Sequence, residues 1–354
     1  MLSNYSPFTI RPKYHYFFSS PLTALIHPLH TALLRLREPP RLLTPSSSSW
    51  EDDGEKKLNK ETIRVVCISD THSLEYPDIP DGDLLIHAGD LTNDGSVDDI
   101  QKAVDWLNGL PHAEKVIICG NHDRFFDPNS RLDEDRNRAS DGGSLIDWGS
   151  SMHYLQHRSV TLTFPSRSIT VYGAPDVPAI VPFGPEHAFT YAPDRDVWTG
   201  TASSPHRNTS MDINTKIDIL VTHTPPQGHL DLSPVYSTGC PYLLAESYRV
   251  RPLLHVFGHI HAAYGSEPVF WDEAQRAWER LCASRRGRPS GSFLLGFVKD
   301  LVDFSGWLDA AKVIVYGVSG AFARPAGSCS WMVNAALMYR DSGQLRNKPQ
   351  VFDI

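Results

Sequence analysis

The sequence of 354 residues lacks three features that define special classes of protein. It has no continuous run of about 18 apolar residues, which argues against a simple membrane span. Its five cysteines are scattered, odd in number and without a Cys-x-x-Cys pair, so they predict buried thiols in a reducing compartment. The net charge of -8 argues against a protein that holds nucleic acid mainly through phosphates. We therefore expect an intracellular, cytoplasmic globular protein.

The N-terminal extension, residues 1–60, differs from the rest of the chain. Its first 50 residues carry five Lys or Arg against one acid, Glu38. Leucines at helical spacing predict an amphipathic helix over residues 21–37, and the Pro/Ser-rich residues 39–60 predict a disordered linker. The helix has three open interpretations: a membrane-surface helix or organelle presequence, a helix packed on the following domain, or an unstructured leader. The first would give peripheral membrane contact or organellar targeting.

Short apolar runs recur in the domain that we expect over residues 61–354. Eight of them, rich in Val and Ile and bounded by Gly, Pro or polar residues, predict buried strands. A helix is predicted behind Ser96, between the second and third runs, and this order indicates an α/β fold. Residues 131–144 predict a polar surface excursion, and residues 266–330 an insertion containing a helix. The eight runs are IRVVCISD, DLLIHAGD, KVIICGNHD, SITVYGAP, KIDILVTHTPP, LLHVFGHIH, AKVIVYGVS and SWMVNAALM.

Five of these runs end in potential metal ligands. The carboxyl ends of strands in an open α/β sheet gather at one edge, so residues distant in sequence can converge there. Each motif alone is also typical of a polar turn. The order DxH, GD, GNHD, TH, GHxH, with each motif closing its own run, indicates a single site. Its members are Asp70, His72, Asp90, Asn121, His122, Asp123, His223, His259 and His261.

The donor types of this set suit a pair of metal ions. Imidazole, carboxylate and amide ligands together favour Mn, Fe, Zn or Ni over Ca, which prefers oxygen alone. Seven ligands, the set without His122 and Asp123, exceed the needs of one four-coordinate ion but serve two ions if one carboxylate bridges them. Such pairs activate a water and hold the oxygens of a displaced phosphoryl group, so the pattern predicts hydrolysis of phosphate esters.

The motifs resemble those of the calcineurin-like metallophosphoesterase superfamily and, more specifically, of the metallophosphoesterase-domain-containing proteins. The resemblance rests on RVVCISDTHS, GDLLIHAGDLT, VIICGNHD, DILVTHTPPQGHLD and LHVFGHIHAAYG. It covers about residues 63–265 and the last thirty or so, and leaves the first 60 residues and the 266–330 insertion unexplained. It implies a four-layer α/β/β/α sandwich with two mixed sheets.

The resemblance also implies a role for each site residue. Asp70, His72 and His261 would hold one divalent ion, Asn121, His223 and His259 the other, and Asp90 would bridge them. His122 would protonate the leaving oxygen, with Asp123 orienting it, and the attacking group would be a metal-bound hydroxide. Manganese is the ion we expect to work best in vitro.

The implied activity is that of a phosphodiesterase acting on small phosphoesters such as cyclic nucleotides. Two alternatives stay open: a phosphomonoesterase or protein phosphatase, and a nucleotide-binding regulatory protein with little turnover. A nucleotide is thus one expected partner, whereas nucleic acid is not expected. Asn93 should only neighbour the site, and His87 and His255, inside apolar runs, should be buried behind it. His229 matches no metal position of the pattern.

Overall fold

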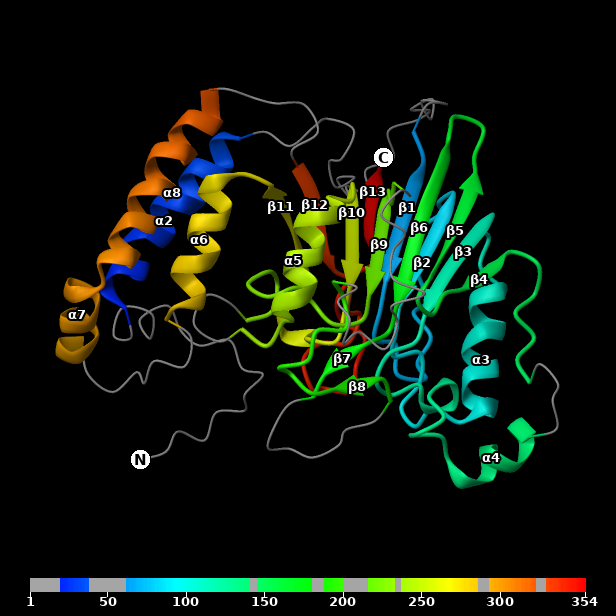
Figure 1. Ribbon diagram of the computed structural model, residues 1–354. Coiled ribbons are helices and arrows are strands. Elements are labelled where there is room, and N and C mark those ends of the chain that lie inside the picture. Colours follow the sequence, from blue (N-terminus) through cyan, green and yellow to red (C-terminus); the bar gives the residue numbers. More distant parts are fainter. Residues whose placement is uncertain are drawn as a thin grey trace.

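The computed structural model describes residues 20–37, 62–140, 145–179, 188–199, 216–232, 237–285, 293–322 and 329–354 (Figure 1). The predicted linker 39–60 lies outside these residues. Two β-sheets stack face to face at the centre of the molecule, and helices cover their outer faces. This arrangement confirms the predicted four-layer α/β/β/α sandwich.

The first sheet has five strands in the order β13-β1-β2-β3-β4. Strands β1 to β4 are parallel and β13 is antiparallel to β1. Helix α3 (Val97–Asn108) joins β2 to β3, and the Ser96 hydroxyl accepts a hydrogen bond from the Asp99 amide, as the capping pattern predicts. The strand bounds are Arg64–Ile68 (β1), Leu84–Ala88 (β2), Glu114–Ile118 (β3), Met152–Tyr154 (β4) and Gln350–Asp353 (β13).

The second sheet has six strands in the order β11-β12-β10-β9-β6-β5. The four inner strands are parallel, and β11 and β5 are antiparallel edges. Helix α5 (Pro241–Val250) covers its outer face (Figure 1). The strand bounds are Arg158–Thr163 (β5), Ser168–Ala174 (β6), Ile219–Thr222 (β9), Leu254–Phe257 (β10), Gly265–Phe270 (β11) and Cys329–Asn334 (β12). The short strands β7 (Val177–Pro178) and β8 (Thr190–Tyr191) pair separately.

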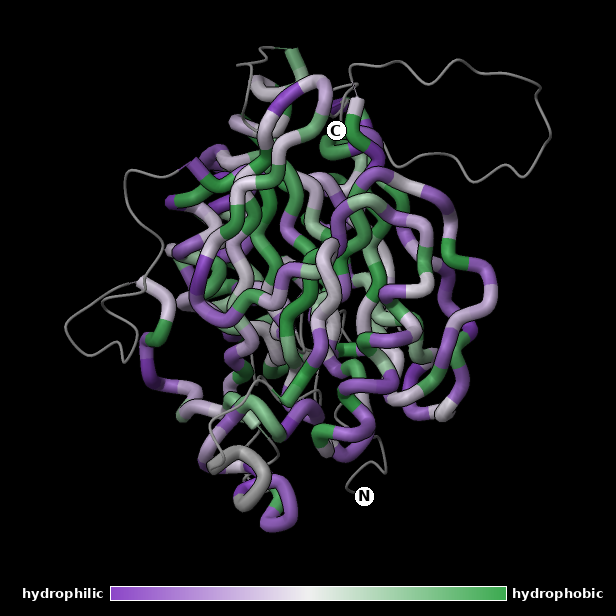
Figure 2. The backbone as a smooth tube through the Cα atoms, turned by 90° about the vertical axis from the view of Figure 1, so that its right-hand side faces the viewer, coloured by the Kyte–Doolittle hydropathy of each residue, from purple (hydrophilic) through white to green (hydrophobic). Residues whose placement is uncertain are grey.

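The main core lies between the two sheets. Val65, Ile86 and Val116 from the first sheet and Val221 and Val256 from the second are fully buried in one cluster. Figure 2 shows hydrophobic segments gathered along the central strands. Because both faces of the inner strands are covered, these strands are nearly continuous apolar runs. Their positions can therefore be predicted from the sequence.

Four helices form a separate layer beyond the second sheet, at the left of Figure 1, which we call the helical module. They are α2 (Pro21–Leu36), α6 (Glu273–Ala283), α7 (Phe293–Val302) and α8 (Phe304–Phe322). Their own core combines Leu22 and Ile26 of α2 with Trp278 and Leu281 of α6 and Val313 of α8. The N-terminal helix therefore packs against the insertion rather than standing alone.

Polar contacts fix α2 at both ends. The Asp300 carboxylate accepts hydrogen bonds from the Ser20 hydroxyl at 2.8 Å and the Leu22 amide at 2.9 Å. At the other end, Arg37 pairs with Asp272 and lies over the Phe270 ring, 4.6 Å from its centroid. Segments almost the whole chain apart are thereby joined.

One predicted strand was wrong, and two other segments contain more regular structure than their sequences indicate. The run AKVIVYGVS lies within α8 and is not a strand, because a short apolar run fits a buried strand or one side of a helix equally well. The polar stretch 131–144 contains a helix, α4 (Asp133–Ser140). The segment 266–330 starts inside β11, so its first residues complete the second sheet.

Two short 3-10 helices follow strands, η2 (Arg124–Phe126) and η3 (His261–Ala263). Across the residues that the structure describes, none of the helices combines the length and apolar character needed to cross a bilayer.

Candidate metal centre

The predicted site residues meet at one edge of the sandwich. Asp70, Asp90 and Asn121 follow β1, β2 and β3 of the first sheet, and His223 and His259 follow β9 and β10 of the second. These strands point toward the lower edge in Figure 1, where both sheets end. Parallel strands thus bring five separate segments together, as the rule for open sheets predicts.

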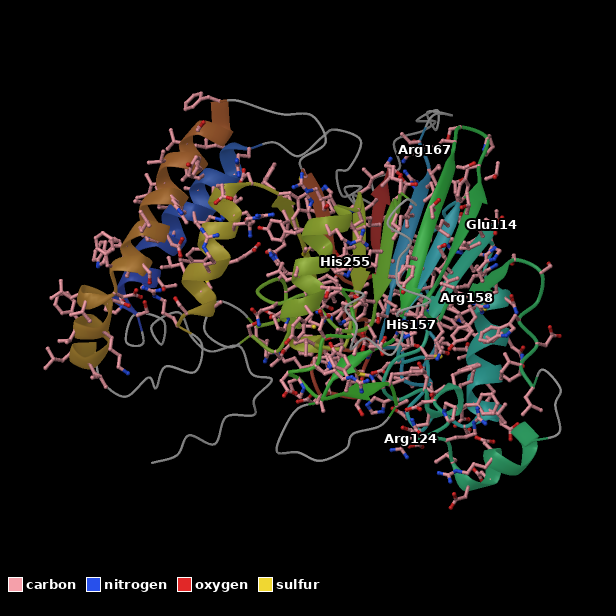
Figure 3. The ribbon with its side chains drawn as sticks, in the orientation of Figure 1. Glu114, Arg124, His157, Arg158, Arg167 and His255 are labelled. Atoms are coloured by element: carbon pink, nitrogen blue, oxygen red, sulfur yellow. The ribbon has the colours of Figure 1, made fainter. Side chains whose placement is uncertain are left out.

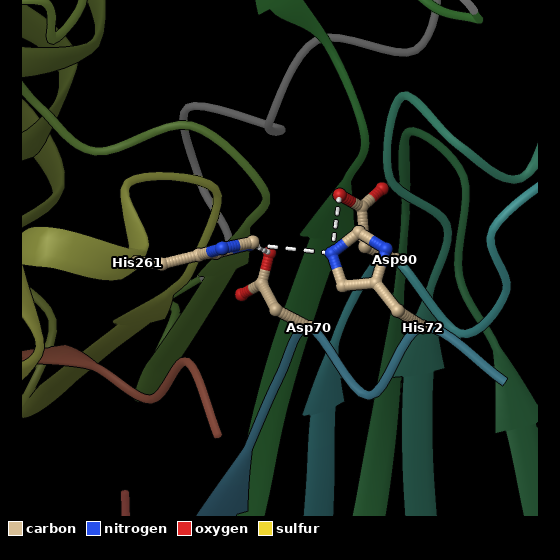
Figure 4. Close-up of side chains that lie close together, drawn as sticks. All are labelled: Asp70, His72, Asp90 and His261. Carbon is tan, nitrogen blue, oxygen red and sulfur yellow. Dashed lines mark hydrogen bonds and ion pairs between the residues drawn. The ribbon is translucent and has the colours of Figure 1, made fainter. Parts of the chain in front are cut away.

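One cluster consists of Asp70, His72, Asp90 and His261 (Figure 4). One ligand atom from each residue lies within 4.8 Å of the others. His72 Nε2 is 3.2 Å from His261 Nε2 and 3.6 Å from Asp90 Oδ2, and His261 Nε2 is 3.2 Å from Asp70 Oδ1. Nitrogen and oxygen donors from three segments therefore face one point.

A second cluster consists of Asp90, His223 and His259, whose ligand atoms meet the same 4.8 Å limit. Asn121 joins it, because its Oδ1 lies 3.1 Å from His223 Nε2. Asp90 Oδ2 is 3.3 Å from the same nitrogen. Asp90 belongs to both clusters, so one buried carboxylate lies between two sets of donors.

Backbone carbonyls orient two of the histidines. His223 Nδ1 lies 2.9 Å from the Ala88 carbonyl, and His261 Nδ1 lies 2.9 Å from the Arg340 carbonyl. A carbonyl can only accept, so each Nδ1 carries the proton and donates it. Each Nε2 thus faces the clusters, and in the neutral ring it would present its lone pair to a metal ion, which is how metal-binding histidines are usually oriented.

The motifs GD, GNHD and GHxH all begin with glycine, and the structure explains this requirement at two of them. A Cβ atom on Gly258 would lie 2.0 Å from Asp70 Oδ2, and one on Gly120 would lie 2.3 Å from Asp90 Oδ1. Any larger residue would therefore displace a carboxylate from the centre. The two positions need glycine for close approach.

The ligand backbone is itself unusual. Asp70, His72, Asp90 and His259 have φ values of 54°, 48°, 53° and 65°, in the left-handed region that non-glycine residues rarely adopt. Such conformations persist only where the surroundings impose them, and they cluster at functional sites. Here backbone hydrogen bonds do so: the His259 amide donates to Asp70 Oδ1 at 3.0 Å, and the His72 amide donates to the Asp90 carbonyl at 3.1 Å.

Burial and neighbouring charges set the protonation of the cluster. Burial lowers the pKa of His259 to about 3, so this imidazole is neutral and has a free lone pair. Burial alone would lower the pKa of His223 too, but the charge of Asp90 outweighs it and raises the pKa to about 9. Burial acts to raise the pKa of Asp90, yet His223 holds it well below its usual range. The carboxylate is thus ionised and attracts a cation.

His122 lies at the rim of the centre, next to Asn121. Its ring is 4.8 Å from that of His72, and its Nδ1 lies 2.7 Å from the Asn93 carbonyl. Asp123 accepts hydrogen bonds from the amides of Leu91, Thr92 and Gly120 and from the Thr92 hydroxyl. These bonds fasten the turns after β2 and β3 to each other, and the carbonyl of Asn93 contacts the ring. No sequence pattern marks that carbonyl, because every residue has one.

Two further histidines lie directly behind the ligands. His87 Nε2 is 3.0 Å from the Thr71 hydroxyl, and His255 Nε2, on β10 (Figure 3), is 2.9 Å from the Thr222 hydroxyl. Burial lowers the pKa of His87 to about 4 and that of His255 to about 3, so both rings are neutral. Each contacts the residue that precedes a ligand histidine, in the buried position expected from the sequence.

The residues at this edge fit a pair of divalent cations. The clusters combine buried, ionised carboxylates with imidazole nitrogens that converge, and such mixed donors suit a transition metal. The ion pairs formed by Asp70 and Asp90 are with histidines. A cation would satisfy the crowded donors.

Several proteins share this part of the chain. A probable rhamnogalacturonate lyase C from Emericella nidulans is 38% identical over 231 residues, covering 64% of this chain and 20% of that protein. The human metallophosphoesterase domain-containing protein 1 is 35% identical over 217 residues, covering 57% of this chain and 61% of that protein. The chain thus spans less than two thirds of either relative. The crystal structure of phosphopantetheinyl hydrolase from Mycobacterium tuberculosis superposes with a TM-score of 0.36 at 20% identity, over 59% of this chain and 86% of that one.

A family model covers the region that carries the site. The model for calcineurin-like phosphoesterases matches residues 63–263, from the residue before β1 to the end of η3. Both donor clusters and His122 lie inside this match. Because it extends over more than half of the chain, the chain belongs to the calcineurin-like phosphoesterase family.

Proposed function

We propose that the protein is a metal-dependent phosphoester hydrolase with a dinuclear site. One observation carries the proposal: Asp90 is shared by two donor clusters that face each other at the end of the sandwich. A shared carboxylate is what a pair of ions needs, and paired ions are typical of enzymes that transfer phosphoryl groups to water. Membership of the family supports the same reaction class.

The donor geometry supports a division of ligands between two ions. Asp70, His72 and His261 would hold one, and Asn121, His223 and His259 the other. Asp90 would contact both. Manganese, iron, zinc and nickel all suit this mixture of nitrogen and oxygen donors. When bound, such ions would activate water and neutralise the phosphate oxygens.

The chain's own contribution beyond the ligands is proton transfer and orientation. We assign His122 as the group that protonates the leaving oxygen, because its ring stands at the rim beside His72. The Asn93 carbonyl accepts a hydrogen bond from Nδ1 and orients the ring, and Nε2 would donate the proton to substrate. Asp123 would position His122 through the backbone, by fixing the turn that carries it.

The substrate that we propose is a small phosphodiester, with cyclic nucleotides as the leading candidates. A cavity of about 760 Å³ lies between α2, α6 and β11; Ala262, Ala263 and Tyr264, which directly follow His261, form one part of its lining, and none of the candidate ligands lines it. Small-molecule sites commonly have volumes of about 300–1,000 Å³.

An assay with stripped and reloaded protein tests the proposal. The full chain is freed of metal, loaded with Mn²⁺ and offered bis(p-nitrophenyl) phosphate, p-nitrophenyl phosphate and 3′,5′-cyclic AMP. We expect metal-dependent hydrolysis of the diesters. Hydrolysis of the monoester alone would refute the diesterase assignment, and hydrolysis of none, by protein that binds two equivalents of Mn²⁺, would refute the enzyme and favour a regulatory binding protein.

A further inference from the structure

The outer surface of the helical module carries most of the exposed apolar side chains of the molecule. Elsewhere in the described residues, the large hydrophobic side chains that are exposed are Leu74 and Tyr339. Phe322, Phe304 and Val302 are 88%, 82% and 76% exposed. We call this surface the apolar face; it comprises Leu25, Leu29, Leu36, Leu294, Leu295, Phe297, Val298, Leu301, Val302, Phe304, Trp307, Leu308, Ile314, Val315, Tyr316, Val318 and Phe322.

We propose that the apolar face docks the protein onto the surface of an anionic lipid bilayer. Large numbers of exposed apolar side chains in one part of a folded protein mark interaction surfaces. The face lies at the end of the molecule away from α3 and the first sheet, so it can meet an extended surface without obstruction from the sandwich (Figure 1). The inference is independent of the phosphoesterase chemistry, because it uses different residues.

The charge on the face has one sign. The acids of α7, α8 and the turn between them point inward: Arg285 pairs with Asp300 at 3.5 Å and with Asp303 at 3.0 Å, and Arg280 pairs with Asp309 at 2.9 Å. None of the acids in the described part of α2, α7 and α8 is exposed. The exposed charges are cations: Lys299 on α7, and Arg35 at the side of α2 that borders the cavity next to β11. Their long apolar stems can lie along a membrane while their heads reach lipid phosphates.

Aromatic side chains add a second membrane-like feature. Trp307 and Tyr316 are both partly exposed on α8, and Trp and Tyr are enriched where a bilayer meets water. Leu and Phe surround them, which is the composition of helices that lie in the interfacial plane.

A second copy of the chain is a poorer match for the same face. Two-fold pairing would place each face against itself. Arg35 and Lys299 would then approach a surface whose described helices offer no exposed carboxylate in return. An anionic bilayer supplies both the apolar layer and the opposite charge.

Vesicle flotation with the full chain tests the proposal. We expect the protein to float with phosphatidylcholine vesicles containing 30% phosphatidylserine, to bind pure phosphatidylcholine less, and to lose the difference at high salt. Leu294→Asp/Phe304→Asp should weaken binding about tenfold or more. Both positions lie in the first turn of a helix, where a carboxylate is compatible with the helix dipole, so the fold should persist.

A matched control places the same two charges on the opposite side of the molecule. Thr163→Asp/Ser166→Asp, at the exposed β5–β6 turn, should leave binding unchanged. Lys299→Gln should weaken binding to phosphatidylserine vesicles about fivefold and leave binding to phosphatidylcholine alone unaltered. Circular dichroism and hydrolytic turnover in solution should match the parent protein in each variant.

Three results would overturn the proposal. The parent protein could fail to float with either vesicle. The Leu294→Asp/Phe304→Asp variant could float as well as the parent. Light scattering could show that the parent protein is a dimer that does not bind vesicles and that the Leu294→Asp/Phe304→Asp variant is a monomer. In that case a second copy of the chain covers the face.

Discussion

The metal centre and the helical module both bury carboxylates, and they neutralise them in opposite ways. In the module, Asp300 and Asp303 meet the guanidinium of Arg285 within the same chain. At the centre, Asp70 and Asp90 meet histidines, whose own protonation depends on those carboxylates. A buried carboxylate whose charge is neutralised by an arginine of the same chain has a structural role, because removing one partner destabilises the fold. A buried carboxylate among imidazoles is prepared for a cation from outside. The contrast separates a structural cluster from a binding cluster. Mutations in each cluster can test whether the two differ in this way.

The largest effect is expected from Asp90→Asn. The change removes the charge shared by both clusters, so Mn²⁺ content should fall at both sites and turnover by more than about 100-fold, since outer partners alone cost 10–100-fold. Elemental analysis and steady-state kinetics check this. Because the metal-free centre loses a carboxylate that has no arginine partner, the variant should fold normally. A variant that retained both ions would refute the bridging role.

His122→Ala should separate proton transfer from metal binding. Ion content should stay at two, while turnover of diesters with poor leaving groups should fall about 10²–10⁴-fold and turnover of nitrophenyl esters much less. His153→Ala is a matched control, because His153 contacts Glu114 on β3, away from the centre. An equal loss for good and poor leaving groups would count against His122 as the acid.

Asp300→Asn should give the opposite phenotype to Asp90→Asn. Arg285 loses one buried partner and α2 loses its anchor at Ser20, so the free energy of unfolding should drop by about 3 kcal/mol, at the lower end of what breaking a buried pair costs. Urea denaturation measures the loss. Metal content per folded molecule should stay unchanged, and a loss of metal would contradict the separation of the two clusters.

His229 joins the sandwich to the module and makes that link depend on pH. It lies 2.8 Å from Glu267 on β11 and 3.0 Å from Glu279 on α6, so both ring nitrogens donate in its charged form. Burial would lower the pKa of His229, but the two hydrogen bonds outweigh it and raise the pKa to about 10. The folded pKa exceeds the unfolded value, so this stabilisation is complete below about pH 6.5 and is lost as pH rises toward 10.

His229→Gln tests that link. Urea unfolding of the parent and the variant should differ by a few kcal/mol at pH 6, where the charged form of the parent is favoured in the folded state, and the gap should shrink toward pH 10. His153→Gln, at a partly exposed ion pair, should give little difference at either pH. A difference in unfolding free energy that stayed constant with pH would mean that His229 stabilises the fold by its packing rather than by its charge.

The sequence was most informative where a candidate ligand directly follows a strand. Asp70, Asp90 and His223 follow strands buried on both faces, so the apolar runs locate the strands and the strand ends locate the ligands. Capping at Ser96 likewise predicted α3. The run within α8 was misread because its apolar residues serve the module core and the apolar face together, which removes the helical period.

Other features have no one-dimensional signal. The carbonyls of Asn93, Ala88 and Arg340 orient histidines, yet any residue supplies a carbonyl. The pairing of α2 with α7 and α8 includes single contacts such as that of Ser20 with Asp300. The spacing of hydrophobic residues in the sequence does not predict such a contact. The pKa shifts arise from burial in the assembled site and follow only from the structure.

The distance along the chain between α2 and its partners has a consequence for synthesis. Translation makes Leu22 and Ile26 more than 250 residues before the residues that cover them, Trp278 and Val313. At about 5–20 residues per second, the interval is on the order of tens of seconds. During that time the sandwich strands can emerge and pair while α2 waits with its apolar side uncovered. The helix that closes the fold is therefore the one that a nascent chain must protect longest.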